Sequence, residues 1–155
     1  MTNVDISSKI LKKGQVNYRL NHLHQGRSEF VQDHALRYLG RVAKRNNFFD
    51  IIILDPPSFS RFEGTVFNVK KDLPLLIEKA FRALTPEGML FVSTNLSSIS
   101  RPQLEAWVHL GAKKTGRKII EVSRLGQDIE FRGSGSMKES FLSAILLKTS
   151  LLHAA

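Results

Sequence analysis

The sequence predicts an α/β fold in which most strands of one sheet run parallel and the last strand runs antiparallel. The apolar run at residues 51–54 and the mostly apolar segment at residues 89–93 are typical of strands that are covered on both faces. Helical patterns alternate with the expected strands along most of the chain. Three of the expected strands end at or next to an aspartate: Asp5, Asp33 and Asp55. Open α/β sheets bind ligands at these carboxyl ends, so the pattern also indicates where a site should lie.

Strands and helices are expected to alternate from the N-terminus to about residue 54. Ser7 or Ser8 can cap the first helix, because a serine hydroxyl accepts hydrogen bonds from N–H groups of the first turn. In the second helix, Leu36, Leu39 and Val42 recur at helical spacing. The expected strands are residues 2–5, 29–32 and 50–54, and the expected helices are residues 7–20 and 35–45.

The rest of the chain continues the pattern with one change near its end. Residues 58–68 are expected to form a loop, and residues 85–88, Thr-Pro-Glu-Gly, a tight turn. No helix separates the last two strands, so they should pair antiparallel. The other expected elements are helices at residues 69–84 and 102–114 and strands at residues 89–93, 118–123 and 140–148.

Composition is that of a soluble domain with a basic surface. The 155 residues are enough for one domain with a sizeable core. The formal charge of +9 favours polyanionic partners such as nucleic acid. No apolar run approaches the roughly 20 residues of a membrane helix, and the N-terminus lacks a signal-peptide pattern, so we expect a cytoplasmic protein with no membrane partner. Cysteine is absent, which excludes disulfides and a cysteine nucleophile.

Residues 49–59, Phe-Asp-Ile-Ile-Ile-Leu-Asp-Pro-Pro-Ser-Phe, carry the clearest functional signal. Asp55 follows four apolar residues, and Pro56 and Pro57 end the strand because proline has no N–H to donate. The prolines hold their carbonyls rigidly, and Phe59 supplies an aromatic ring for stacking. A carboxylate, fixed carbonyls and a ring suit a planar group with N–H donors, such as a nucleobase edge. We expect Asp55, Pro56, Pro57 and Phe59 to form the catalytic site.

This segment resembles motif IV of class I S-adenosylmethionine-dependent methyltransferases of the Asp-Pro-Pro type. The order of strands, helices and the Thr-Pro-Glu-Gly turn resembles motifs II to V of that superfamily, over nearly the whole chain. The resemblance implies a Rossmann-like methyltransferase sheet, S-adenosylmethionine as the cofactor, and direct transfer of its methyl group without a metal.

Two further strand ends resemble cofactor-binding motifs of the same superfamily. Asn3-Val4-Asp5-Ile6-Ser7 is similar to the acidic strand end that holds the cofactor ribose, and Gln32-Asp33-His34 is similar to motif III, where Asp33 would meet the adenine amino group. Each aspartate has a simpler alternative as a helix N-cap. The resemblance implies the following cofactor-binding residues: Asp5, Ile6, Asp33, His34 and Asp55.

The bacterial large-subunit ribosomal RNA methyltransferases, especially the guanine-N7 type, are the most similar group. The resemblance lies in Asp-Pro-Pro-Ser-Phe-Ser at residues 55–60 and in Ser-Thr-Asn at residues 93–95. It implies methyl transfer to a base in RNA. Related cytosine-C5 enzymes carry a cysteine near Asn95, which this chain lacks. An adenine-N6 or guanine-N2 enzyme is an alternative, although those usually have an aromatic residue where Ser58 stands.

One part of the superfamily pattern is missing. Class I methyltransferases open with a strand and a glycine-rich loop around the methionine portion of the cofactor, whereas only residues 1–4 precede Asp5 here. Residues 1–155 are therefore expected to be a single, truncated methyltransferase domain. The absent strand belongs between the strands that end at Asp5 and Asp55. We expect its place to be closed by direct pairing of those strands or filled, including by a homodimer through exposed sheet edges.

The missing loop also favours a second interpretation. In this alternative the chain is a non-catalytic basic RNA-binding remnant, or a partner domain that another chain completes. His22 and His24 have a spacing that allows chelation, but without a third ligand they indicate a solvated turn. We therefore expect no metal site.

Overall fold

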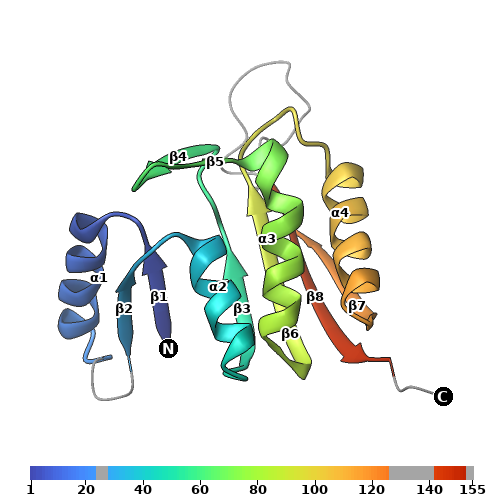
Figure 1. Ribbon diagram of the computed structural model, residues 1–155, viewed down its shortest axis with the longest axis horizontal. Coiled ribbons are helices and arrows are strands. Elements are labelled where there is room, and N and C mark those ends of the chain that lie inside the picture. Colours follow the sequence, from blue (N-terminus) through green and yellow to red (C-terminus); the bar gives the residue numbers. More distant parts are fainter. Residues whose placement is uncertain (24–27, 126–141, 153–155) are drawn as a thin grey trace.

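The computed structural model describes residues 1–23, 28–125 and 142–152 (Figure 1). Its first half contains β1 (Thr2–Asp5), α1 (Ser8–Leu20), β2 (Glu29–Gln32), α2 (Ala35–Lys44) and β3 (Phe49–Leu54). It continues with β4 (Phe59–Phe62), β5 (Thr65–Asn68), α3 (Val69–Ala83), β6 (Leu84–Thr94), α4 (Arg101–Lys114), β7 (Arg117–Leu125) and β8 (Ser143–Leu151). None of the described helices is long and apolar enough to cross a membrane.

The strands form a parallel pair, β1–β2, and a mixed sheet in the order β3-β6-β8-β7. Strands β3 and β6 run parallel, whereas β8 is antiparallel to both of its neighbours. Figure 1 shows β1, β2, β3 and β6 pointing the same way, with α2, α3 and α4 in front of the strands. The expected parallel α/β sheet with an antiparallel last strand is confirmed. Part of the strand expected at residues 140–148 lies outside the described residues, and the described strand is Ser143–Leu151.

The core lies where α3 and α4 pack on the mixed sheet. Leu73, Ile77 and Phe81 of α3 recur at helical spacing and are almost fully buried. Gly111 of α4 allows the two helices to approach closely, because a Cβ atom there would lie 3.0 Å from Cγ2 of Ile77. Helix α3 also contacts β3, the strand that precedes the Asp-Pro-Pro segment.

Residues 58–68 form a β-hairpin, so the expectation of a loop is wrong. Strand β4 pairs antiparallel with β5. Glu63 and Gly64 form the turn, with φ angles of 46° and 76°, because two-residue hairpin turns of this kind require positive φ at both positions. Phe62 and Thr65 pair across the turn. The hairpin follows the carboxyl end of β3 and extends over the gap between β3 and β1 (Figure 1).

Residues 85–88 are part of strand β6, whereas a separate turn was expected there. The register of β6 against β3 shifts between the pair Phe49–Leu84 and the pair Ile51–Met89. Residues 85–88 therefore form a bulge, which carries extra chain length without ending the strand.

A buried arginine holds this bulge. The guanidinium of Arg117 donates hydrogen bonds to the carbonyl oxygens of Leu84 at 2.5 Å, Thr85 at 2.9 Å and Pro86 at 3.1 Å. It also donates to Oγ1 of Thr149 at 3.1 Å. Burial lowers the pKa of Arg117. The side chain satisfies carbonyl groups that the irregular strand leaves without ladder partners.

The space between β1 and β3, called the slot below, contains no strand among the described residues. The two strands do not pair, so the expectation that they would close the gap directly is wrong. Helix α2 packs against both β1 and α3 and so keeps the strands apart. The slot forms a cavity of about 650 Å³ lined mainly by apolar side chains. Ile51 and Ile53 of β3 are 57% and 69% exposed beside it, so the expectation that residues 51–54 are covered on both faces is wrong on the side of the slot.

Candidate functional site

A second cavity, of about 180 Å³, lies at the carboxyl ends of β1, β2 and β3. It is called the strand-end cavity below. Its lining includes every expected cofactor-binding residue and three of the four expected catalytic residues: Asp5, Ile6, Asp33, His34, Asp55, Pro56 and Pro57. It adjoins the slot, because the two cavities share five lining residues: Val4, Asp5, Ala35, Ile53 and Leu54. In the described part of the chain, no group of three or more His, Asp or Glu side chains is placed to hold a metal ion.

Asp5 ends β1 with one carboxylate oxygen available. Its Oδ1 accepts a hydrogen bond from the N–H of Ser7 at 2.7 Å. Ser7 is the N-cap of α1, and its hydroxyl accepts from the N–H of Ile10, so the alternative that Asp5 is the N-cap is wrong. Within the described residues no donor reaches Oδ2 of Asp5, and this oxygen can therefore accept hydrogen bonds from a ligand.

Asp33 follows β2 and is only 2% exposed. Its Oδ1 accepts from the N–H of His34 at 2.7 Å and from Nε of Arg37, and its Oδ2 accepts from Arg41. Burial alone would raise the pKa of Asp33, but the hydrogen bonds from Arg37, His34 and Arg41 outweigh it and lower the pKa below the usual 3.8. Asp33 is therefore ionised and binds two arginines. The N-cap of α2 is His34, so the alternative that Asp33 is the N-cap is wrong.

The imidazole of His34 is buried in the wall of the strand-end cavity with one nitrogen unpaired. Its Nδ1 accepts from the N–H of Leu36 at 3.3 Å, which assigns the proton of the neutral ring to Nε2. Nε2 is buried and has no partner in the described residues. A buried donor without an acceptor costs about 1–3 kcal/mol. His34 is therefore suited to donate to a ligand in this cavity.

Asp55 is held by a serine from the neighbouring strand. Ser93, buried at the end of β6, donates its hydroxyl to Oδ1 of Asp55 at 2.5 Å. The carboxylate is otherwise exposed, and its Oδ2 has no donor among the described residues. Beside it, the hydroxyl of Ser58 donates to Oδ1 of Asn95 at 3.3 Å. The carboxyl ends of β3 and β6 together hold Asp55 in place, and its Oδ2 is left as a hydrogen-bond acceptor for a ligand.

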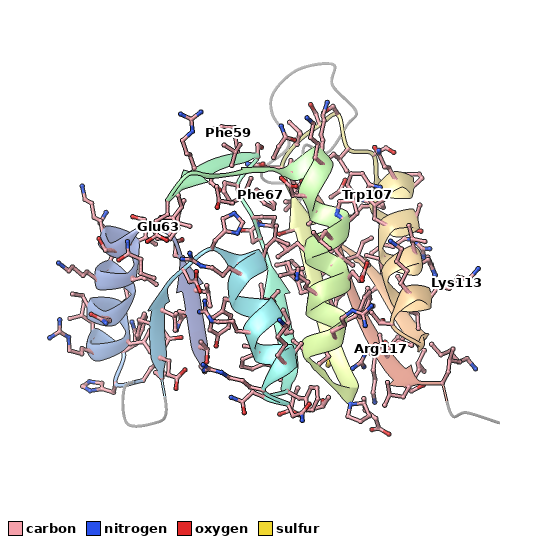
Figure 2. All side chains as sticks on the ribbon, in the orientation of Figure 1. Phe59, Glu63, Phe67, Trp107, Lys113 and Arg117 are labelled. Carbon is pink, nitrogen blue, oxygen red and sulfur yellow. The ribbon has the colours of Figure 1, made fainter. Side chains whose placement is uncertain are left out.

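Phe59 is the expected site residue that the structure places elsewhere. Side chains alternate along the hairpin, and Ser60 and Phe67 on its inner face line the strand-end cavity. Phe59 lies on the outer face and is 55% exposed. Figure 2 shows Phe59 above the hairpin and Phe67 below it, toward the body of the domain. The structure therefore does not bring Phe59 together with Asp55.

Arg37 connects the hairpin to the strand-end cavity. Besides Asp33, it donates to Oε2 of Glu63 at the hairpin tip, at 2.9 Å. Its guanidinium carbon lies 5.7 Å from the centre of the Phe62 ring, within the range of a cation–π contact. Arg37 and Arg41 follow Asp33 by four and eight residues on one helix face, a spacing that could have signalled the ion pairs.

The fold and the strand-end cavity define the class of this protein. Residues 1–134 match the S-adenosylmethionine-dependent methyltransferase family. The chain belongs to that family, whose cofactor is S-adenosylmethionine. The lining fits this cofactor, because Asp5 and His34 offer an acceptor and a donor that the described residues leave unpaired.

Relatives in the family act on ribosomal RNA, according to their names. The chain is 28% identical over 150 residues to a Bacillus subtilis (strain 168) protein named provisionally as the ribosomal RNA large subunit methyltransferase YwbD, covering 95% of this chain and 37% of that protein. It is 36% identical over 97 residues to ribosomal RNA large subunit methyltransferase K/L of Legionella pneumophila (strain Lens), covering 61% of this chain and 13% of that protein. The chain thus spans well under half the length of these relatives.

Solved structures support the same class. SMU.776, named provisionally as a methyltransferase and solved in complex with SAH, superposes with a TM-score of 0.80 at 26% identity. The match covers 95% of this chain and 38% of that one. A methyltransferase from Agrobacterium tumefaciens gives a TM-score of 0.78 at 22% identity, over 95% of this chain and 48% of that one, which shows the shared fold.

The ion pairs of Asp33 predict a pH dependence of stability. Because its pKa is lower in the folded than in the unfolded chain, Asp33 stabilises the fold above about pH 4, and this stabilisation is lost as the pH falls through the lowered pKa. We expect Asp33→Asn to flatten the decline of the unfolding free energy between about pH 5 and pH 2. Urea unfolding at several pH values measures this decline.

The control for this experiment is Glu87→Gln, at an exposed carboxylate that has no ion pair in the described residues. This variant should keep the wild-type pH profile. The carboxylates of Glu78 and Glu105 also have lowered pKa values because of their arginine partners, so a residual slope remains in Asp33→Asn. An unchanged profile in Asp33→Asn would contradict the ion pairs.

Proposed function

We propose that this domain transfers the methyl group of S-adenosylmethionine to a base in RNA, with ribosomal RNA as the substrate and the cytoplasm as the location. The observation that carries the proposal is the convergence of Asp5, Asp33 and Asp55 from three strand ends on one cavity. The names of the relatives and the +9 charge favour RNA as the methyl acceptor.

On the cofactor side, each lining residue has a distinct proposed role. The carboxylate of Asp5 accepts hydrogen bonds from the ribose hydroxyls, next to the backbone of Ile6. Nε2 of His34 donates to a ring nitrogen of the adenine. Asp33 already accepts three hydrogen bonds, and a carboxylate has about four acceptor positions. The adenine amino group would occupy the remaining one, so Asp33 both positions Arg37 and contacts the cofactor.

On the base side, the Asp-Pro-Pro segment positions the methyl acceptor. Asp55, fixed by Ser93, accepts an N–H of the base edge, and the carbonyl of Pro56 accepts another. Pro57 keeps this backbone rigid. The bound cofactor supplies a sulfonium-activated methyl group, and the protein contributes orientation of the acceptor atom. A base within an RNA helix must first be unstacked to reach this edge.

The exposed sheet edges lead to a proposed homodimer. On the side that faces the slot, neither β1 nor β3 has a partner among the described strands, and an unpaired edge can pair with another chain. Sedimentation velocity over a hundredfold range of protein concentration measures the association. A chain that stays monomeric at the highest concentration would rule out the homodimer and leave another polypeptide as the partner.

The isolated chain is expected to bind S-adenosylmethionine weakly. The reason is that the strand-end cavity opens into the slot, where no glycine-rich backbone encloses the methionine portion within the described residues. Isothermal titration calorimetry is the measurement. A dissociation constant in the low micromolar range, about −8 kcal/mol, would show that another segment of this chain replaces the loop.

Methyl transfer itself is tested in what is called the completed chain below, defined as the 155 residues preceded by a strand and glycine-rich loop of the class I methyltransferase pattern. Tritiated S-adenosylmethionine and protein-free large-subunit ribosomal RNA are the substrates. Incorporation of label by the completed chain supports the proposal. No incorporation, despite cofactor binding by the same protein, would contradict it and favour the second candidate, a non-catalytic RNA-binding or partner domain. The open slot is the observation that favours this candidate.

A further inference from the structure

We propose that the outer face of the β4–β5 hairpin binds an unpaired nucleotide adjacent to the target base. This inference rests on the proposed function, because it takes the strand-end cavity as the place of methyl transfer. The outer face is defined by Phe59 and Arg61 of β4 and by Val66 and Asn68 of β5, which pair across the hairpin.

The outer face combines a ring, a guanidinium and an aliphatic side chain, all open to solvent. Phe59, Arg61 and Val66 are exposed, although the inner face of the same hairpin is covered and includes the almost completely buried Phe67. Phe59 and Arg61 stand two residues apart on one strand face, about 7 Å along the strand. A base that stacks on Phe59 therefore places its phosphate within reach of Arg61.

The charge around this face is complementary to a phosphate backbone. Arg61 and Lys70 are exposed and have no ion pair among the described residues, and Lys70 lies in the first turn of α3, directly after the hairpin. The acidic residue of the hairpin, Glu63, is bound to Arg37, so its charge is compensated. A positive field next to an aromatic ring is the usual arrangement for single-stranded nucleic acid, and RNA-binding sheets commonly stack bases on solvent-facing aromatics.

The hairpin is fixed relative to the strand-end cavity, which gives the contact a defined place. Glu63 is tied through Arg37 to Asp33, and the N–H of Val69 donates to the carbonyl of Ser58 at 3.1 Å. The inner face of the hairpin lines the cavity and the outer face is turned away from it. A strand of RNA whose target base enters the cavity must therefore pass the hairpin, where the neighbouring nucleotide meets Phe59.

The test is fluorescence anisotropy of the 155-residue chain with a fluorescein-labelled, unstructured RNA of ten nucleotides, without cofactor. Phe59→Ala is expected to raise the dissociation constant about tenfold, since stacking on an aromatic ring is a major part of such binding. Arg61→Gln is expected to weaken binding and to lower the salt slope by about one. Matched controls are Phe48→Ala and Arg45→Gln. Both residues are exposed in the connection that precedes β3, at the amino end of that strand, and Phe48 is 49% exposed.

Several outcomes would overturn the proposal. Equal effects of Phe59→Ala and Phe48→Ala would exclude stacking on the hairpin, and equal affinity for a blunt RNA duplex of the same length would exclude an unpaired nucleotide. Binding is measured without methyl transfer, so the completed chain can be inactive while the hairpin binds RNA. Conversely, the completed chain can methylate RNA while Phe59→Ala changes neither affinity nor KM, which would contradict only this inference.

Discussion

Asp55→Ala in the completed chain is expected to reduce methyl transfer at saturating cofactor about a hundredfold or more, with little change in cofactor affinity. Asp55 projects from the end of β3, where Ser93 fixes one oxygen and the other is exposed. A misplaced acceptor base costs this much because transfer depends on alignment of the reacting atoms. Single-turnover rates with tritiated cofactor, together with calorimetry, separate the two quantities.

Asp5→Ala is the matched comparison, since both aspartates line the same cavity at the end of a strand. Its free oxygen lies on the ribose side of the proposed arrangement. This variant should weaken cofactor binding and leave the saturated rate much less affected. If both substitutions raised the cofactor dissociation constant equally and neither altered the saturated rate, the division of roles between the two carboxylates would be wrong.

Arg117→Met is expected to cause the largest loss of stability, about 3 kcal/mol or more. The substitution keeps the aliphatic volume but leaves the bulge carbonyls of Leu84, Thr85 and Pro86 without their donor. A buried acceptor that loses its partner costs about 1–3 kcal/mol. Urea unfolding at pH 7 gives the free energy directly.

The control is Lys118→Met at the adjacent, exposed position, which should change the unfolding free energy by less than about 0.5 kcal/mol. Arg117→Lys should fall between the two, because an ammonium group retains the charge but cannot reach several carbonyls in the planar arrangement of a guanidinium. Equal stability of Arg117→Met and Lys118→Met would mean that the bulge does not depend on this side chain.

The sequence predicted the strand ends well because their signal is local. Each expected strand stops at an aspartate, which marks the strand direction and the ligand-binding edge. Parallel pairing of β1 with β2 brings Asp5 and Asp33 together, whereas Asp55 reaches the same cavity from β3, which pairs with neither of those strands. The assignment of residues 58–68 to a loop failed for a local reason as well. Glutamate rarely adopts a positive φ, yet Glu63 does so here and forms the turn of a hairpin with Gly64.

Other features depend on contacts between distant segments and could not be predicted in this way. The hydrogen bond from Ser93 to Asp55 requires the register of β6 against β3, and the contacts of Arg117 require the bulge that shifts that register. Phe59 illustrates the same limit. Its type suits stacking on the target base, but the alternation of side chains along β4 places it on the outer face.

The slot also separates two parts of the structure that are expected to open independently. Among the described strands, no backbone ladder joins the pair β1–β2 to the mixed sheet. The two parts are linked by α2, which contacts both β1 and α3, and by the Arg37 ion pairs. Proteins open in such contiguous units with different free energies. Amide hydrogens of β1 and β2 should therefore exchange through openings that cost less free energy than those of β6 and β8. Each opening of β1 and β2 would separate Asp5 and Asp33 from Asp55.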